Sequence, residues 1–219
     1  MDVFEQLENI EKKEAPYSKI SSFEKQPIIE AASYYKKLAT TLKQLDFEAI
    51  NQAVYLIQKT WRNKKQIICF GNGGSALTAQ HFITDWNKSV LLLTGSPFRG
   101  RSLTENMGLI TAYANDISYQ DIFIEQLKNI FEPGDLLIGI SGSGNSENVL
   151  RAISYGNAQG SPTIGLCGFD GGKLKQLAKY VVLAPIHDMQ VSEDIHFSFG
   201  HLVMQAICGI RNPLSLEEE

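Results

Sequence analysis

The feature that most constrains this chain is a series of short apolar runs that alternate with amphipathic stretches. Four runs occupy residues 66–70, 136–140, 163–167 and 180–184, and a shorter one covers residues 101–104. Apolar strands that alternate with helices are typical of a parallel sheet covered on both faces. The sequence therefore predicts the α/β class: a single-domain αβα sandwich with a doubly wound parallel sheet. Ligands of such sheets bind beyond the carboxyl ends of the strands.

Amphipathic periodicity predicts the helices. Two precede the first strand: one from Pro27 to Leu45, and one that Asp46 can cap and that continues to Trp61. Two helices before the first strand are more than are needed to cover one face of a sheet, so we expect them to pack on a partner subunit. Further helices are predicted over residues 106–114, 118–131, 147–159, 172–178 and 192–210, and a loop with an apolar segment over residues 87–100.

Composition excludes several classes of protein. A net charge of −4 and a pI near 5.6 argue against a primary role in binding nucleic acid or anionic membranes. No stretch approaches the roughly 18 apolar residues of a spanning helix, and the charged start has no signal peptide. The three cysteines, Cys69, Cys167 and Cys208, lie far apart in apolar runs, which indicates reduced thiols in a cytoplasmic protein. Along the chain we expect a leader at 1–25, the domain at 26–212 and an acidic tail at 213–219.

The stretch Gln66–Trp86 reads as a strand, a glycine-rich turn and a helix. The turn, Gly71–Ser75, leaves the first amides of the helix free, and such amides favour an anion, typically a phosphate. Gly71, Gly73 and Ala76 formally match the dinucleotide fingerprint. However, the region where that motif expects a carboxylate reads LLLTGSP and has none. A tight strand-to-helix turn without a ligand is the alternative interpretation.

A second loop, Ser141–Ser146, places three serine hydroxyls among glycines directly before a predicted helix. Hydroxyl donors together with helix-end amides bind the oxygens of a phosphate monoester without a metal. Ser146 could instead cap the helix, with Asn145 in a left-handed turn. That alternative explains one or two of these residues but not all three serines, so the loop favours a phosphate site.

Candidate acid–base and metal-binding side chains occur on two predicted helices. His81 and Asp85 are one turn apart and share a helical face. The last helix adds Glu193, Asp194, His196 and His201. Each has a structural alternative without a catalytic or metal-binding role. His81 and Asp85 could form an ordinary hydrogen bond, the acidic residues could stabilise the helix start, and His201 could be a buried histidine with a polar partner. Without C-x-x-C or H-E-x-x-H, spacing alone gives only a weak metal signal.

Four motifs occur in a fixed order: GNGGSALTAQHF, ISGSGNSENVLRAI, GFDGGKL and EDIHFSFGHL. Together they resemble the sugar isomerase (SIS) domain family, and within it the bacterial phosphoheptose isomerases, over roughly residues 30–210. The resemblance implies a parallel αβα sandwich and a homotetramer with sites between subunits. It also implies a small sugar phosphate as substrate, with neither nucleic acid nor membrane as a partner, and one zinc ion per subunit.

The resemblance also implies a role for individual residues. The substrate-binding residues would be Asn72, Gly73, Ser75, Asn115, Asp116, Ser141, Gly142, Ser143, Ser146 and Glu193. The zinc ligands would be His81, Asp85, Glu193 and His201. Of these, Asp85 and His201 would also be the catalytic acid–base residues.

Three positions depart from the pattern of the phosphoheptose isomerases. Asp85 replaces a glutamate, Glu193 replaces a glutamine and Gly142 replaces a common threonine. The shorter Asp85 could hold a base away from the sugar carbon, whereas a carboxylate at 193 should favour a divalent ion. On a straight helix Glu193 and His201 would be about 12 Å apart along the axis. Glu193 is therefore expected at or before the helix start, unless the two residues serve different sites.

The sequence as a whole favours a ketose–aldose isomerase that acts on a seven-carbon sugar phosphate through an enediol. One alternative is an enzyme of the same family with another sugar phosphate as substrate, which the replaced residues suggest. The other is a non-enzymatic member, similar to the relative that binds the bacterial replication initiator. That relative lacks the acid–base residues of the isomerases, whereas this chain keeps a carboxylate and a histidine.

Overall fold

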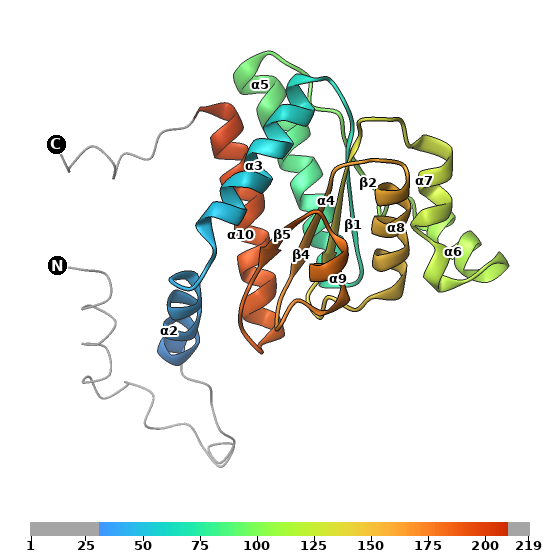
Figure 1. Ribbon diagram of the computed structural model, residues 1–219. Coiled ribbons are helices and arrows are strands. Elements are labelled where there is room, and N and C mark those ends of the chain that lie inside the picture. Colours follow the sequence, from blue (N-terminus) through green and yellow to red (C-terminus); the bar gives the residue numbers. More distant parts are fainter. Residues whose placement is uncertain (1–30, 210–219) are drawn as a thin grey trace, which may run out of the picture. The chain divides into compact units, whose positions relative to one another are not determined.

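The structure is a computed structural model that describes residues 31–209 (Figure 1). The predicted leader, the acidic tail and the first residues of the first predicted helix lie outside this range. The described chain divides into two units at Gln44. The first unit contributes helix α2 (Ala31–Leu42), and the second contains the remaining helices and all strands.

The second unit is built on one sheet of five parallel strands in the order β2-β1-β3-β4-β5. The strands are β1 (Ile67–Gly71), β2 (Gly100–Ser102), β3 (Leu136–Ser141), β4 (Thr163–Cys167) and β5 (Tyr180–Leu183). The chain steps outward from β1 in both directions, so the carboxyl ends of the central strands β1 and β3 adjoin at the point where the winding reverses. This confirms the predicted doubly wound α/β sheet.

Helices cover both faces of the sheet (Figure 1). They are α3 (Phe47–Arg62), α4 (Gly74–Asp85), α6 (Met107–Asp116), α7 (Ile124–Ile130), α8 (Glu147–Ala158), α9 (Gly172–Leu177) and α10 (Met189–Cys208). One buried cluster joins α3, α4 and α10 to one face of the sheet, and a second joins α7, α8 and α9 to the other. Within β1, Ile67 and Cys69 belong to the first cluster and Ile68 and Phe70 to the second, as the alternation of side chains in a strand requires.

The predicted Asp46 cap is confirmed, since its carboxylate accepts the amide of Ala49 at 3.0 Å. The apolar face of α3 lies against the chain's own sheet: Ile50, Ala53 and Ile57 are buried in the first cluster. The α3 helix thus uses this face within the subunit, and oligomer packing by α2 stays a prediction.

The expected loop over residues 87–100 is wrong in its first half. The α4 helix continues through a π-helical turn (Trp86–Val90) into α5 (Leu91–Thr94) and ends at Gly95, which has a φ of 72°. Trp86 and Val90 are fully buried and hold this extension to the core. The three leucines that follow are exposed, so the apolar run indicated helix continuation rather than burial.

Two predicted helix boundaries also need correction. The helix expected over 118–131 is split into a 3-10 turn (Tyr119–Asp121) and α7, and Ser118 donates its hydroxyl to the Asp121 carboxylate instead of capping an amide. The last helix begins at Met189 rather than at Ser192, since the Asp188 carboxylate caps the amide of Val191. Within residues 31–209, no helix is both long and apolar enough to cross a membrane.

Candidate active site

Helices α4 and α10 bring three ionisable side chains together. His81 Nε2 lies 3.0 Å from His201 Nε2 and 3.2 Å from an Asp85 carboxylate oxygen, and that oxygen lies 3.6 Å from His201 Nε2. One potential ligand atom from each residue lies within 4.8 Å of the other two. Two imidazoles and a carboxylate that leave a position open are the ligands typical of a catalytic zinc ion. The three residues could therefore hold a metal ion.

The cluster is ordered by packing yet reachable from solvent. The ring of Phe197 stacks on His81 with centroids 4.3 Å apart and meets His201 edge-on. His201 keeps 44% of its side-chain surface exposed and Asp85 keeps 24%. A substrate can reach groups exposed to this extent, whereas a buried structural His–Asp pair would be closed to it.

Glu193 takes a different place from the other predicted ligands. It lies inside α10, so the expectation that it stands at or before the helix start is wrong. Its carboxylate packs against Gly74 at the beginning of α4, where an added Cβ would come within 2.7 Å of Oε1. The cluster of potential ligands does not include Glu193 among the described residues. Glu193 therefore faces the glycine-rich turn, about two helical turns along α10 from His201.

In the β1–α4 turn, close packing accounts for Gly71 and backbone conformation accounts for Gly73. At Gly71 an added Cβ would lie 2.7 Å from the Ile140 carbonyl oxygen, and Gly73 adopts a φ of 54°. The Asn72 side chain exchanges two hydrogen bonds with Asn148 and accepts one from the Tyr119 hydroxyl at 2.8 Å. The turn is thus fixed by its backbone and by one amide network. Ser75, the other predicted contact of this loop, is buried at the start of α4.

The serine loop after β3 is compact. The hydroxyls of Ser141 and Ser146 lie 3.0 Å apart, and Ser146 is the residue before α8, where it makes no capping bond. The Ser143 hydroxyl accepts the Asn145 amide at 3.3 Å. Ser146 therefore occupies the N-cap position of α8 without a side-chain capping bond, and the phosphate site stays a prediction. Two hydroxyl groups thus lie close together at the N-terminus of α8, a helix of twelve residues. Such an arrangement favours the binding of an anion.

Close packing explains why a glycine stands at position 142, which the sequence alone did not show. A Cβ added at this position would lie 2.3 Å from the sulfur of Met189, the first residue of α10. The backbone carbonyl of Gly142 accepts the amide of Gly168 at 2.8 Å. Met189 thus occupies the space that a larger residue would take, and Gly142 can contribute only its backbone to a ligand.

Asn115 and Asp116 lie at the exposed end of α6, where the Asn115 amide donates to the Asp116 carboxylate at 2.8 Å. Neither side chain contacts the histidine cluster through a hydrogen bond or ion pair in the described part of the chain. Tyr119, three residues after Asp116, does reach Asn72. The pair therefore lies three to four residues before the side chain that contacts the glycine-rich turn.

His196 is buried between α10 and the sheet and differs from the exposed histidines. Its side chain is 1% exposed, and neither ring nitrogen has a hydrogen-bond partner among residues 31–209. Burial lowers its pKa to about 4, against a smaller opposing effect of the Cys167 backbone. His196 is therefore neutral at pH 7 and a core residue in this structure.

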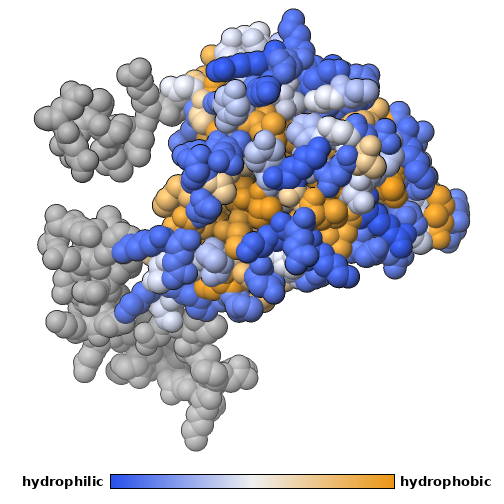
Figure 2. Space-filling model, in the orientation of Figure 1, coloured by the Kyte–Doolittle hydropathy of each residue, from blue (hydrophilic) through white to orange (hydrophobic). Residues whose placement is uncertain are grey.

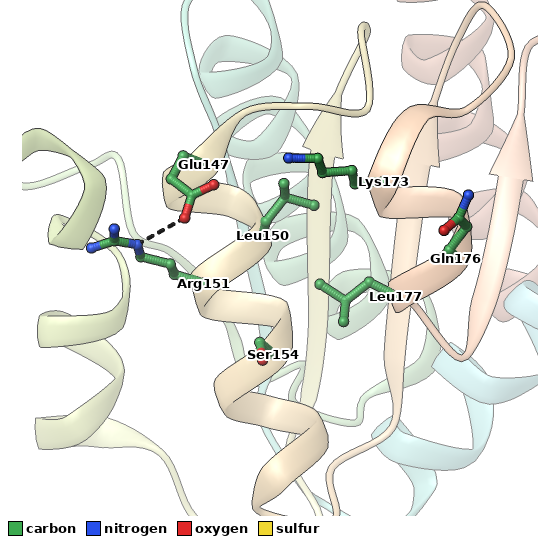
Figure 3. A pocket seen from close by; sticks show the side chains of 7 residues that line it. All are labelled: Glu147, Leu150, Arg151, Ser154, Lys173, Gln176 and Leu177. Carbon is green, nitrogen blue, oxygen red and sulfur yellow. Dashed lines mark hydrogen bonds and ion pairs between the residues drawn. The ribbon is translucent and has the colours of Figure 1, made fainter.

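A hollow of about 400 Å³ lies between α8 and α9 (Figure 3). Its lining consists of Glu147, Leu150, Arg151, Ser154, Lys173, Gln176 and Leu177. Glu147 neutralises Arg151 through a 3.0 Å ion pair, and Figure 3 shows Lys173 extending toward α8. No predicted site residue lines this hollow.

Comparison with known proteins identifies the family. The model of the SIS domain matches residues 33–168. The chain belongs to the SIS domain family. A phosphoheptose isomerase of Aliarcobacter butzleri is 35% identical over 82% of this chain and 94% of its own length. One from Helicobacter pylori strain P12 is 34% identical over 81% of this chain and 92% of its own.

Solved structures of SIS-domain enzymes share the fold. The phosphoheptose isomerase of Neisseria gonorrhoeae has a TM-score of 0.75 at 27% identity and covers 82% of this chain and 97% of its own. That of Francisella tularensis has the same TM-score at 26% identity, with 81% and 95% covered. The similarity extends beyond the SIS-domain match and takes in nearly the whole length of these relatives.

Three residues of this SIS-domain site escaped the sequence reasoning. They are Tyr119 and Asn148, which hold Asn72, and Phe197, which stacks on His81. Asn148 lies in the motif ISGSGNSENVLRAI, whose resemblance to the family was the one signal that could have marked it. Phe197 stands four residues before His201, a spacing that puts both on one helical face.

Proposed function

We propose that this protein is a phosphoheptose isomerase that interconverts sedoheptulose 7-phosphate and the corresponding aldose heptose 7-phosphate. The observation that carries the proposal is the convergence of His81, Asp85 and His201 in a chain that also has two loops suited to a sugar phosphate. The relatives named phosphoheptose isomerase support the choice of substrate, because this chain matches them over more than nine-tenths of their length.

The serine loop is the proposed phosphate site. Ser141, Ser143 and Ser146 would donate hydroxyl hydrogen bonds to the phosphate oxygens, and the first amides of α8 would add their own. The terminal phosphate is remote from the reacting carbons. Its binding energy therefore positions C1 and C2 of the sugar without itself taking part in the chemistry.

Asp85 and His201 are the proposed proton-transfer groups. One takes the proton from C1 of the ketose; the C1–H pair forms the C1–C2 double bond, and the C2=O π pair moves to O2, which takes a proton to give the enediol. A proton then adds to C2 at the expense of the C1–C2 double bond, and O1 loses its proton as the C1=O double bond of the aldose forms. Each step needs a group within hydrogen-bond reach of carbon or oxygen, and both side chains are exposed at one edge of the cluster.

Zinc is the metal that we propose for the cluster, with His81, Asp85 and His201 as ligands. When bound, it would polarise the sugar carbonyl and stabilise charge on its oxygen. Glu193 is assigned to the sugar side, with Asn72, Gly73 and Ser75, because its carboxylate lies against Gly74. Asn115 and Asp116 are assigned to the same substrate as a further pair.

We also propose a homotetramer with sites between subunits. Large apolar side chains are exposed to solvent around the cluster. Leu77, one turn before His81 on α4, is 67% exposed, and Phe197 and Leu202 on α10 are also exposed. Figure 2 shows that apolar side chains also reach the surface in the middle of the face drawn there. A neighbouring subunit would cover this surface and close the site. The buried free thiols Cys69 and Cys167 support a cytoplasmic location.

A second candidate is an SIS-domain isomerase for another sugar phosphate. Two carboxylates favour this second candidate. The resemblance to the phosphoheptose isomerases implies a glutamate at the position of Asp85 and a glutamine at the position of Glu193. A carboxylate near the glycine-rich turn accepts hydrogen bonds from sugar hydroxyls but donates none. That difference would change which hydroxyl arrangement fits the turn.

The test is turnover by the zinc-loaded protein, followed by NMR of the products, with sedoheptulose 7-phosphate beside five- and six-carbon ketose phosphates. The proposal expects clean isomerisation of the heptulose with the highest kcat/KM. Faster turnover of another sugar phosphate would favour the second candidate. Absence of any turnover would contradict both.

A further inference from the structure

The three residues of the cluster meet across the contact between α4 and α10. Asp85 is a short carboxylate, with one methylene between Cα and the carboxyl group. Its oxygen nevertheless lies 3.6 Å from Nε2 of His201 on the other helix. Such a short side chain reaches across two helices only where their axes come close together.

Gly200 makes the close approach possible. A Cβ built on Gly200 would lie 2.2 Å and 2.3 Å from two ring atoms of Phe82 on α4, far inside van der Waals contact. The Phe82 ring is fully buried and stacks on Trp86 with centroids 4.9 Å apart, so it has little freedom to move aside. Any side chain at position 200 would therefore push α10 away from α4.

Trp86 holds the two helices at this distance. Its indole Nε1 donates to the carbonyl oxygen of Gly200 at 2.9 Å, and the ring is fully buried. Trp86 begins the π-helical turn, whose Asn87 side chain bonds both the amide and the carbonyl of Gly100 on β2. Hydrogen bonds thus link the π-helical turn that carries Trp86 to the sheet, and Trp86 in turn is hydrogen-bonded to α10.

These contacts lie next to the cluster in sequence as well as in space. Phe82 follows His81, Trp86 follows Asp85, and Gly200 precedes His201. A shift of α10 against α4 would therefore move His201 away from both partners at once.

We infer that Gly200 and Trp86 are positioning residues that set the α4–α10 distance at which His81, Asp85 and His201 bind one metal ion. Neither residue touches the substrate in this assignment. The inference rests on the proposed zinc site, and it adds the reason why a short aspartate suffices there.

The test measures zinc affinity by competition with a chromogenic chelator, beside kcat and KM for sedoheptulose 7-phosphate. Gly200→Ala should weaken zinc binding at least tenfold and lower kcat, with KM little changed. Trp86→Phe, which keeps a buried ring but removes the donor, should weaken zinc binding several-fold. In Gly200→Ala the additional change Asp85→Glu should restore much of the zinc affinity, because the longer carboxylate spans the wider gap.

Ile207→Ala is the matched control, since Ile207 lies in the same buried cluster on α10 but two turns from the ligands. It should lower thermal stability and leave zinc affinity unchanged. Folded Gly200→Ala and Trp86→Phe proteins with wild-type zinc affinity would overturn the inference, as would an equal loss in Ile207→Ala. If the wild-type protein bound no zinc, the proposed metal centre would fail together with the inference.

Discussion

The serine loop and the histidine cluster serve the same proposed substrate but are built in opposite ways. The loop gathers Ser141, Ser143 and Ser146 within six consecutive residues. The cluster joins His81 to His201, which are 120 residues apart, through the packing of two helices. A loop of this kind depends on local backbone geometry, whereas the cluster depends on every contact that sets the helix distance. The two should therefore respond differently to substitution.

The cluster should show the largest effect. His201→Ala removes both a proposed proton-transfer group and a ligand, so we expect kcat to fall about a thousandfold or more, since general acid–base catalysis alone contributes ~10²–10⁴-fold. Gln205→Ala, at an exposed position one turn along α10, is the control and should be as active as the wild type. Steady-state kinetics with the heptulose phosphate check this. Near wild-type turnover by His201→Ala would remove the cluster from the chemistry.

His196 sharpens the contrast on the same helix, because it is buried where His201 is exposed. Its pKa of about 4 lies below the usual value of 6.5, so as pH falls the unfolded chain takes up the proton first. The contribution of His196 to the free energy of unfolding should therefore fall between about pH 6.5 and pH 4, by up to about 3 kcal/mol, and should be constant above that range. Denaturant titrations at several pH values measure it.

His196→Leu supplies the control for that pH dependence. It removes the titrating group from the core, so its free energy of unfolding should depend less steeply on pH than that of the wild type over the same window. Identical pH dependence in the two proteins would show that His196 is not a buried neutral residue.

The serine loop should respond mainly in binding. Ser141→Ala removes one hydroxyl donor to the phosphate, and a hydrogen bond to a charged group contributes about 1.5–3 kcal/mol. We expect KM to rise about tenfold or more, with kcat reduced less than by any change in the cluster. Ser154→Ala, on the solvent side of α8, is the matched control (Figure 3). A loss confined to kcat would place the loop at the reacting carbons instead.

Phe197 should show the smallest effect. Its ring stacks on His81 at 4.3 Å, and such a contact contributes on the order of 1 kcal/mol. Phe197→Leu should therefore weaken zinc binding a few-fold and leave KM for the sugar phosphate unchanged. The chelator competition measures this directly. An increase in KM without a change in zinc affinity would assign Phe197 to the substrate.

The same contrast explains what the sequence could predict. All five strands, the Asp46 cap and the serine loop follow from patterns within a few residues, and the structure has them. The π-helical turn at Trp86 could not be predicted, because it depends on buried contacts of Trp86 with distant residues, among them its hydrogen bond to the carbonyl of Gly200. Local patterns do not report such contacts.

The candidate site was predictable to the same extent. The i,i+4 spacing put His81 and Asp85 on one face, but only the packing at Gly200 shows that His201 reaches them. The position of Glu193 beside Gly74 depended on where α10 begins, and the Asp188 cap sets that start three residues earlier than the periodicity indicated.

The central claim is that His81, Asp85 and His201 form the metal centre of a heptose phosphate isomerase. The most direct test strips the protein with a chelator, returns zinc in measured amounts and follows conversion of sedoheptulose 7-phosphate to the aldose by NMR. The account predicts little activity in the stripped protein and a rise that ends at one zinc per subunit. Full activity without zinc, or none after its return, would contradict it.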